Sequence, residues 1–287
     1  MTTMILYPSN YFESNKPETV FSKEYAAVLA NPAFDARLCD YDGFDAGGKL
    51  KLNRPVGEPV KCLWRGWMML PERYRQFYEQ CKNLKLELFT DPQAYELMHC
   101  FPNAYKRIGS GDTPHIEVFG NRIIAETVNE RFDAFMVKDY VKSAKRTAFP
   151  QRIETPVTQE ECDRLSAEFI KLRGDLYTGG IVCKQLMELK KYAMRTNEWR
   201  GFYLFGKLLD LSGNSMQFPA CPAPPHDLVG RMEGFDSPFY TVDFGELSDG
   251  SWTVLETGDG QVSGLATEAM PEEFYEALAD GLAVIGR

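Results

Sequence analysis

The segment PFYTVDFGELSDGSWTVLETG, residues 238–258, constrains the fold of this chain more than any other stretch. It carries Asp249-Gly250 between two strand-like runs, and this dipeptide is typical of a two-residue type I′ turn. The segment is therefore predicted to form a β-hairpin. Counting outward from that turn places Asp243 opposite Glu256 on one face of the hairpin, with Cβ atoms about 4.5–5.5 Å apart.

This pair of acids permits two interpretations. Two carboxylates at that distance repel each other unless a cation lies between them or one of them takes up a proton. Hard oxygen ligands in this arrangement suit Mg²⁺ that also holds phosphate oxygens. The alternative is a solvated sheet edge where Asp243 and Glu256 point into water, or a longer turn that shifts the register.

A second feature is the basic segment that follows the apolar run FDAFMV. If the strand continues, its alternation puts Lys138, Tyr140 and Lys142 on one side. Three further basic residues come close behind, namely Lys145, Arg146 and Arg152. Phosphate is the expected counter-ion for so dense a positive charge in an otherwise acidic protein, and a solvated basic loop is the alternative.

Two more charged positions begin or end apolar strands. Lys184 lies near the end of the strand GGIVCKQL, which makes it either an exposed edge residue or a phosphate contact in a cleft. Glu198 and Arg200 open the strand EWRGFYL and share one face. The alternative for these two residues is a surface ion pair worth less than about 1 kcal/mol.

The chain divides into two parts of different architecture. Strand-like runs at residues 4–8, 36–41, 60–68 and 84–90 alternate with helical stretches near 16–29, at 72–82 and from Pro92, which predicts an α/β domain with a mainly parallel sheet. The glycine-rich stretch after Tyr105 marks the boundary, so the predicted domains are residues 1–108 and 109–287.

The second part is predicted to be α+β, with helices packed on antiparallel strands. Its best-defined element is a helix at residues 156–173, where Thr158 and Glu161 form a capping box and Gly174 ends the helix. Leu165, Phe169 and Leu172 are expected to share its buried face. The remaining predicted elements are strands at 132–141, 179–186 and 198–211, a proline-rich loop at 219–225, short and C-terminal helices at 227–234 and from Pro271, and the hairpin.

Composition removes several classes of function. The net charge of −9 argues against an extended nucleic-acid surface. Seven cysteines without a Cys-x-x-Cys pair are expected to be reduced and mostly buried, and three histidines supply little material for a metal site or a Ser-His-Asp triad. The chain has no signal-peptide pattern and no apolar run near the ~20 residues of a membrane span, so we expect a cytoplasmic protein.

Taken together, the motifs resemble the ATP-grasp superfamily. VKDYVKSAK, GGIVCKQLMEL, EWRGFYLFGK and TVDFGELSDGSWTVLETGDGQVSGL are similar to the clade named for one arginine and two lysines, found in phages and bacteria. The resemblance covers residues 114–268 with specific motifs, and the preceding segments LWRGWM and FTDPQAY more loosely. It implies an ATP-grasp fold of two α+β lobes that bind ATP between them, behind an N-terminal pre-ATP-grasp α/β domain.

The resemblance also implies roles for the basic residues. Lys138 and Lys184 would bind ATP from the two strands that cover it, one near the α- and β-phosphates and the other near the adenine edge. Lys142 falls in the phosphate-loop region. Arg200 would stabilise the transferred phosphoryl group, so Arg200 and Lys138 are the expected catalytic residues of this part of the chain.

The segment after Lys184 matches the interlobe hinge, near residues 185–190. Its backbone would hydrogen-bond adenine, with Glu188 placed for the ribose. The cofactor-binding residues expected here are Gln185, Leu186, Met187 and Glu188.

Asp243 and Glu256 match the ligands of Mg²⁺, and one departure from the family concerns the last metal position. The family commonly has Glu-x-Asn there, whereas this chain has Glu256-Thr-Gly258. The register puts Gly258 on the metal face without a side chain. Asp259 is the remaining candidate ligand, and it would reach the metal only if the chain turns there.

The reaction implied is carboxylate activation by ATP and Mg²⁺, giving an acyl phosphate that an amine attacks to form an amide or peptide-like bond. The acceptor can be a free amino acid, a peptide or a protein. One alternative is a nucleotide-binding regulatory module that has lost ligation, which Gly258 supports. A nucleotidyltransferase that forms lysine-AMP would need a Lys-x-Asp-Gly motif, and the only Lys-Asp pair, at Lys138, continues as Tyr-Val.

Arg65, in VKCLWRGWM, is the candidate contact for the substrate acid. It follows an apolar strand, where an α/β sheet presents ligands, and a guanidinium there could hold a carboxylate with two hydrogen bonds. The alternative is an arginine packed against Trp64 and Trp67 at the domain junction.

Overall fold

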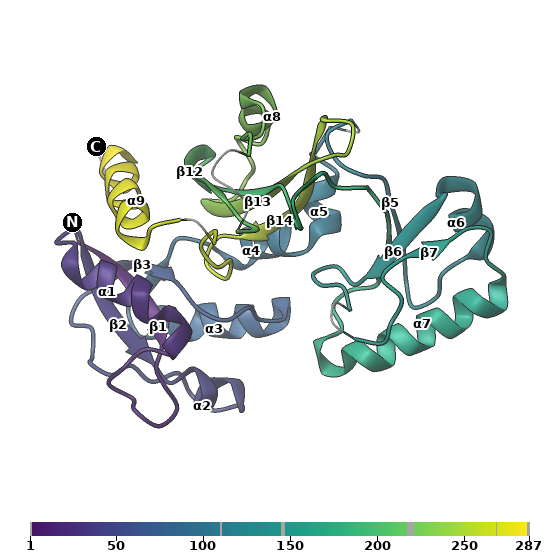
Figure 1. Cartoon of the computed structure of the whole chain (residues 1–287). Helices are drawn as coiled ribbons and strands as arrows, with labels where there is room; N and C mark the ends of the chain where they lie inside the picture. The colour runs from purple at the N-terminus through teal and green to yellow at the C-terminus, as the bar shows by residue number, and fades with distance from the viewer. Residues whose placement is uncertain (1, 110, 145–146, 217–220, 268, 286–287) are drawn as a thin grey trace.

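The computed structural model describes residues 2–109, 111–144, 147–216, 221–267 and 269–285. Its elements form three four-stranded sheets, with the second sheet between the other two (Figure 1). The first sheet is parallel throughout, in the order β2-β1-β3-β4, which confirms the predicted α/β layer. Its strands are β1 (Thr3–Pro8), β2 (Phe34–Cys39), β3 (Val60–Trp64) and β4 (Leu86–Leu88).

Each face of the first sheet is covered by helices because alternate residues of β1 are apolar on both sides. Met4 and Leu6 pack with α3 (Pro71–Asn83), and Ile5 and Tyr7 pack with α1 (Ser22–Ala30). Short elements complete this part of the chain: η1 (Thr19–Phe21) and α2 (Tyr41–Asp45).

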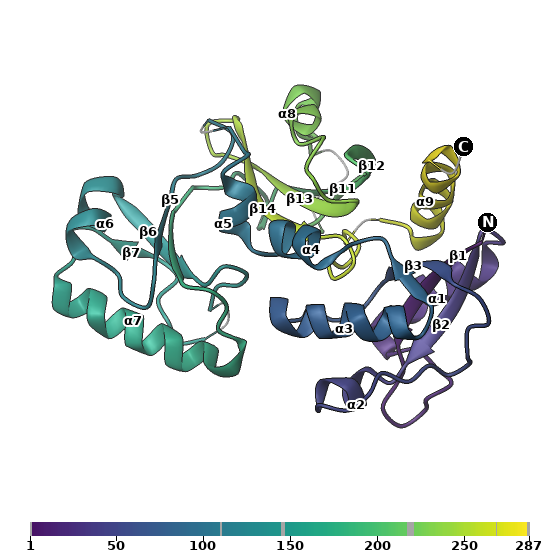
Figure 2. The ribbon, with the colours of Figure 1, turned by 180° about the vertical axis from the view of Figure 1, so that it is seen from behind.

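The C-terminal helix α9 (Pro271–Ile285) begins at the predicted proline and returns to the first sheet (Figures 1 and 2). The hydroxyls of Tyr275 and Tyr7 lie 2.7 Å apart, and Phe274 and Leu278 share the apolar cluster of the α1 face. The two ends of the chain are therefore joined by one core, which the sequence patterns did not predict.

The second sheet is antiparallel, in the order β12-β11-β13-β14. The strands are β11 (Glu198–Leu204), β12 (Lys207–Gly213), β13 (Phe239–Glu246) and β14 (Trp252–Asp259), and α8 (His226–Arg231) lies over the sheet. The helices α4 (Pro92–His99) and α5 (Phe101–Tyr105) join its core through Met98, Phe101 and Ala104.

The third sheet, in the order β5-β8-β6-β7, is also antiparallel. Its elements are β5 (Ile116–Phe119), α6 (Ala125–Arg131), β6 (Ala134–Lys138), β7 (Ile153–Glu154), α7 (Gln159–Arg173), η2 (Gly174–Leu176) and β8 (Ile181–Gln185). A small ribbon of β9 (Lys191–Tyr192) and β10 (Arg195–Thr196) links it to the second sheet. The predicted α+β character of this half is confirmed, although the sequence patterns missed β5 and α6.

The hairpin of β13 and β14 forms with a different turn from the one predicted. Leu247 donates its N–H to the carbonyl of Ser251, and Gly250 has a φ of 86°, so the loop has three residues rather than two. A bulge in β14 then compensates, because Gly245 pairs with Thr253 whereas Asp243 pairs with Glu256. The two departures cancel, and the predicted pairing of the two acids is confirmed.

Two predictions about α7 and β6 need correction. Thr158 caps α7 by accepting the N–H of Glu161, as predicted. Leu172 shares the helical face of Leu165 and Phe169, but it lies in the last turn of α7 and is 45% exposed. Strand β6 ends at Lys138 instead of continuing. The carboxylate of Asp139 accepts the N–H groups of Val141 and Lys142 and turns the chain there, so strand alternation does not place Lys142.

The seven cysteines are free and buried, as predicted. Lys145 and Arg146, and residues 217–220 with part of the predicted proline-rich loop, lie outside the described residues. Within the described ranges, no helix has the length and apolar character that crossing a membrane requires.

Candidate functional site

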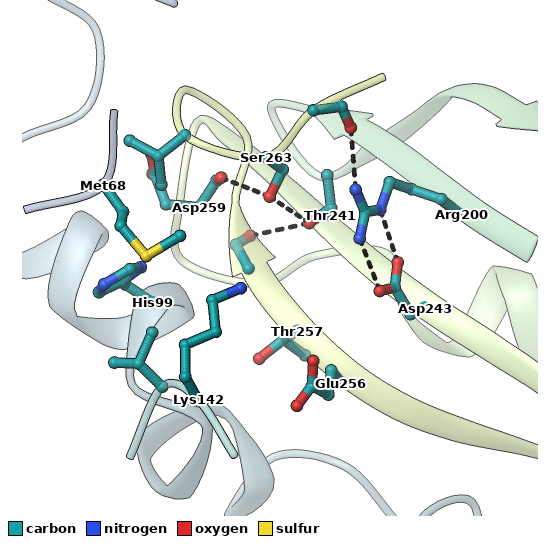
Figure 3. A pocket seen from close by; sticks show the side chains of 14 residues that line it. Met68, His99, Lys142, Arg200, Thr241, Asp243, Glu256, Thr257, Asp259 and Ser263 are labelled. Carbon is teal, nitrogen blue, oxygen red and sulfur yellow. Dashed lines mark hydrogen bonds and ion pairs between the residues drawn. The ribbon is translucent and has the colours of Figure 1, made fainter. Parts of the chain in front are cut away.

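A cavity of about 210 Å³ lies where the second sheet meets the β6–β7 turn and the loop after β3 (Figure 3). Strands β11, β13 and β14 supply its charged floor because their in-register positions point to one side. The residues that line it are Met68, His99, Val141, Lys142, Arg200, Thr241, Asp243, Glu256, Thr257, Gly258, Asp259, Val262, Ser263 and Gly264.

Arg200 and Asp243 form the first ion pair of the floor. They are register partners on β11 and β13, and the guanidinium Nε and Nη2 each donate to the carboxylate over 2.7 Å. Burial alone would lower the pKa of Arg200, but the charge of Asp243 and its hydrogen bonds raise it. Arg200 also donates to the carbonyl of Gly264, so it is held from two sides.

Lys138 and Glu256 form the second ion pair. Lys138 is 1% exposed, and its Nζ atom lies 2.5 Å from Oε1 of Glu256. Burial would raise the pKa of Glu256, but the charges of Lys138, Lys184 and Lys142 outweigh this effect and lower the pKa to about 2. Glu256 is therefore ionised at neutral pH, and three lysines converge on one carboxylate.

Lys184 lies in the interior of the third sheet because β8 pairs with β5 on one side and β6 on the other. It is 6% exposed, donates to the carbonyl of Leu255, and its Nζ lies 4.6 Å from the ring centroid of Phe101. This arrangement excludes the exposed-edge interpretation, and the phosphate contact stays a prediction.

Lys142 reaches the cavity from the β6–β7 turn, with its amino group directed toward β14 (Figure 3). Desolvation lowers the pKa of this lysine, and the nearby charges of Lys138 and Arg200 act in the same direction while Glu256 opposes them. The three cations Lys138, Lys142 and Arg200 therefore gather around the two acids of the hairpin, although the turn rather than strand alternation brings Lys142 there.

Gly258 has a local packing reason. A Cβ atom at this position would lie 2.8 Å from both the Thr241 and Ser263 hydroxyl oxygens, which are themselves 2.9 Å apart. The space of a side chain at position 258 is thus taken by a pair of hydroxyls. These two residues were missed because isolated threonine and serine residues carry no sequence signal.

Asp259 is fully buried at the end of β14, and it lines the same cavity. Its Oδ1 accepts the backbone and side-chain N–H groups of Gln261, while Oδ2 has no hydrogen-bond partner in the described structure. Burial raises the pKa of Asp259 to about 7, because the hydrogen bonds from Gln261 and the charge of Arg65 only partly offset it.

The predicted hinge residues run from the third sheet toward the second. Gln185 and Leu186 donate their N–H groups to His115 and Ala134 of the third sheet, whereas the carbonyl of Glu188 accepts the N–H of Ser248 at the hairpin tip. Met187 lies between these two attachments and is half-buried. The segment thus connects the two sheets, while its adenine and ribose contacts stay a prediction.

Arg65 follows β3, as predicted, and its contacts favour the alternative interpretation, a structural arginine at the domain junction. It is 1% exposed, and its Nε and Nη2 atoms donate to the two carboxylate oxygens of Glu24 over 2.9 and 3.0 Å. Its Nη1 atom donates to the carbonyls of Gly260 and Ser263. These contacts direct the guanidinium into the core, so Arg65 joins the first sheet to the loop after β14 rather than facing a substrate carboxylate.

Carboxylates are available here for a metal ion, but they do not make up a complete set of protein ligands. Among the residues that the structure describes, no three histidine, cysteine, aspartate or glutamate side chains cluster as a metal site. The in-register pair Asp243 and Glu256 offers hard oxygen ligands of the kind that Mg²⁺ shares with phosphate oxygens and water.

The comparisons with known proteins agree with this geometry. Residues 116–278 match the model of an ATP-grasp domain family, which is family 3 of the clade named for one arginine and two lysines. No curated protein matches the sequence.

Solved structures extend the likeness to the whole chain. A RimK domain protein ATP-grasp from Sphaerobacter thermophilus has a TM-score of 0.61 at 15% identity, covering 98% of this chain and 99% of its own. The ATP-grasp ligase PsnB, complexed with precursor peptide PsnA2 and AMPPNP, has a TM-score of 0.58 at 11% identity over 100% and 98% of the two chains. D-alanyl-alanine synthetase A from Vibrio cholerae has a TM-score of 0.58 at 10% identity, with 99% of each chain covered. The predicted fold class is confirmed.

Proposed function

The chain belongs to the ATP-grasp domain family that forms family 3 of the one-arginine, two-lysine clade, and on this basis we propose that it is an ATP-dependent carboxylate–amine ligase acting through an acyl phosphate. The observation that carries the proposal is the double ion pair of the cavity, Arg200 with Asp243 and Lys138 with Glu256. Arg200, Asp243 and Glu256 line the cavity, and buried Lys138 pairs with Glu256, so two cations and two anions supply both halves of a phosphate–metal site.

Mg²⁺ fits this donor set. Asp243 and Glu256 are register partners with carboxylate oxygens on the cavity side, and the buried Oδ2 of Asp259 has no hydrogen bond among the described residues. We assign Asp243 and Glu256 as ligands; Asp259, the third ligand expected from the sequence, does not form a cluster of three with them in the described structure, and its role stays a prediction. When bound, Mg²⁺ would withdraw charge from the phosphate oxygens.

The basic residues would act on the phosphates. Lys138 and Lys184 lie on neighbouring strands of the third sheet and are both buried, so their charges are little screened by water. Arg200 presents a planar guanidinium beside Asp243, suited to the γ-phosphate. Lys142, which lines the cavity from the β6–β7 turn, supplies a further positive charge.

In this reaction a carboxylate oxygen of the substrate forms a bond to the γ-phosphorus of ATP while the bond to the β-phosphate oxygen breaks, which gives ADP and an acyl phosphate. The amine nitrogen then bonds to the acyl carbon, phosphate leaves, and the nitrogen loses a proton. Lys138, Lys142 and Arg200 would neutralise the charge that the phosphoryl group carries during transfer. No nucleophilic side chain is required.

The acid and the amine are proposed to be amino acids or peptides. This proposal draws on two proteins of the same fold, one named D-alanyl-alanine synthetase and the other described with a precursor peptide. Protein acceptors with an accessible carboxylate fall within the same chemistry.

Hydroxylamine trapping tests the proposal without knowledge of the natural amine. The protein is incubated with Mg²⁺, ATP, hydroxylamine and a set of D- and L-amino acids and dipeptides, and ADP release and hydroxamate are measured. We expect both products with at least one acid, and their loss in Lys138→Met. The control Lys207→Met, whose side chain is 80% exposed, should behave as wild type. Mg²⁺-dependent ATP binding without ADP release for any acid, peptide or host protein would favour the nucleotide-binding module that Gly258 suggests.

A further inference from the structure

The cavity has a second wall that the phosphate chemistry does not use. Met68, in the loop between β3 and α3, and His99, the last residue of α4, lie on the side away from Arg200 and Asp243 (Figure 3). Val262, in the loop after β14, also lines the cavity. We call Met68, His99 and Val262 the neutral wall.

The neutral wall carries no charge at neutral pH. His99 is 7% exposed and stacks on Tyr95 with ring centroids 4.7 Å apart. Burial, together with the charges of Lys142 and Lys138, lowers the pKa of His99 to about 3. The imidazole is therefore uncharged beside Met68, in contrast to the opposite side of the cavity.

The loop that carries Met68 is held on both sides. Gly66 donates its N–H to the carbonyl of Gln261, and Met69 exchanges two hydrogen bonds of 2.8 and 2.9 Å with the hydroxyl of Tyr95. Met68 nevertheless stays 42% exposed, so a fixed apolar surface faces an aqueous cavity.

We propose that the neutral wall receives an apolar side chain of the acid that this protein activates, so that the acid is an amino acid or peptide residue with an apolar side chain. The inference rests on the proposed ligase function. The carboxylate of such a substrate would lie toward Arg200 and Lys142, and its side chain would cover Met68.

Two physical effects support this orientation. Covering apolar surface is favourable by about 25 cal/mol per Å², whereas a charged side chain set against Met68 and neutral His99 would lose part of its hydration and find no opposite charge on the neutral wall itself.

The test compares acids by their side chains. The purified full chain is given Mg²⁺, ATP and hydroxylamine with leucine, methionine or phenylalanine, and with aspartate or lysine, each in both chiral forms. We expect kcat/KM for hydroxamate formation to be at least about tenfold higher for the best apolar acid, a range typical of hydrophobic pockets. Met68→Asp should abolish this preference, and calorimetry measures separately any change that its new charge makes to Mg·ATP affinity.

Two further variants keep the test specific. Met68→Leu, which retains the apolar surface, should retain the preference. Met194→Asp introduces the same charge at a residue that is 91% exposed and does not line the cavity, and it should leave the preference as in wild type.

Direct binding separates failure of this inference from failure of the ligase proposal. Saturation-transfer NMR measures contact of the same probes with the protein in the presence of AMPPNP. Hydroxamate from charged acids at rates equal to apolar ones, or an unaltered preference in Met68→Asp, overturns the neutral-wall assignment while ligation stands. If no acid gives hydroxamate, the ligase proposal fails. In that case, apolar probes that bind wild type but not Met68→Asp still support the neutral-wall assignment. If apolar probes do not bind wild type, the neutral-wall assignment is overturned.

Discussion

Arg200 on β11 faces Asp243 on β13 as a register partner and holds its carboxylate with two hydrogen bonds of 2.7 Å. Lys138 holds Glu256, which lines the same cavity. Each of these two cations, which we assign to phosphate, is therefore already neutralised by an acid that we assign to Mg²⁺. ATP alone would leave the acids uncompensated and Mg²⁺ alone would leave the cations uncompensated, so binding of the two should be strongly coupled.

Glu256→Gln tests this coupling. The amide keeps the size of the side chain but removes the charge that Mg²⁺ and Lys138 share, so Mg·ATP affinity should fall by about tenfold or more, equivalent to about 1.4 kcal/mol. ATP affinity in the presence of a chelator should change less or rise, because Lys138 is released. Calorimetry with and without Mg²⁺ measures both affinities, and an unchanged Mg·ATP affinity would remove Glu256 from the site.

Lys138→Ala and Lys184→Ala should each lower ATP turnover by about 100-fold or more, because each removes a buried positive charge that we assign to phosphate. Lys207→Ala, on the exposed part of β12, is the matched control and should retain turnover. Near-normal ATP consumption by Lys138→Ala in a coupled ADP assay would show that β6 does not bind the nucleotide. Lys145→Ala, at a position outside the described residues, is expected to be milder.

The pair Asp243 and Glu256 shows how a correct pairing could be predicted from an incorrect turn. The two-residue turn that predicts this register does not form, yet the longer turn and the bulge at Leu255 cancel. The apolar face of the hairpin is packed in the sheet core, through Val242, Phe244 and Val254, and a slip of one residue would reverse it. Burial therefore enforces the register even where the turn chemistry differs.

Arg65 and Lys184 show where sequence patterns were insufficient. The edge interpretation of Lys184 stayed open because strand order cannot be read from one strand, and only the pairing of β8 with β5 and β6 buries it. Arg65 lacked a visible partner because Glu24 is 41 residues away and its other hydrogen bonds go to backbone carbonyls of the loop after β14. Long-range contacts of this kind carry no local signal.

Glu24→Gln tests the structural role of Arg65. Both side chains are buried, so removing the carboxylate charge leaves an uncompensated guanidinium and should lower the free energy of unfolding by about 3–5 kcal/mol. Arg65→Lys should also lower the melting temperature because an ammonium cannot replace the two-pronged contact. Urea denaturation measures the first effect and calorimetry the second. A raised KM for the acid in Arg65→Lys, without loss of stability, would support the interpretation that Arg65 contacts the substrate carboxylate.

His99 should make stability depend on pH. Its pKa is lowered from 6.5 to about 3, so between these values the unfolded chain binds a proton that the folded protein does not. The contribution of neutral His99 to the free energy of unfolding is complete above pH 6.5 and is lost as the pH falls toward 3. Between pH 7 and pH 5 this contribution falls by about 2 kcal/mol. Asp259, whose pKa is raised from 3.8 to about 7, acts in the opposite direction over most of this range and by a similar amount between pH 7 and pH 5.

The contribution of His99 is therefore measured as a difference. Urea denaturation at pH 7 and pH 5 measures how the free energy of unfolding changes with pH in wild type and in His99→Gln. On going from pH 7 to pH 5, this change should be about 2 kcal/mol more unfavourable in wild type than in the variant, because Asp259 contributes equally to both. Equal changes would mean that the imidazole is protonated in the folded protein, and the neutral wall would then carry a charge.

Gly258→Asn introduces the residue that the resemblance to the family implies for this position, and its outcome depends on Thr241 and Ser263. A Cβ atom at 258 lies 2.8 Å from both hydroxyl oxygens, so the single variant should lose about 1–3 kcal/mol of stability through overpacking. Adding Gly258→Asn to a Thr241→Ala, Ser263→Ala background should cost less, because both clashing oxygens are gone. In that background the amide oxygen is free to act as a ligand, and we expect Mg²⁺ affinity, measured by calorimetry with AMPPNP present, to rise above that of the background. Equal stability losses in both backgrounds would show that the hydroxyl pair is not what excludes a side chain at position 258.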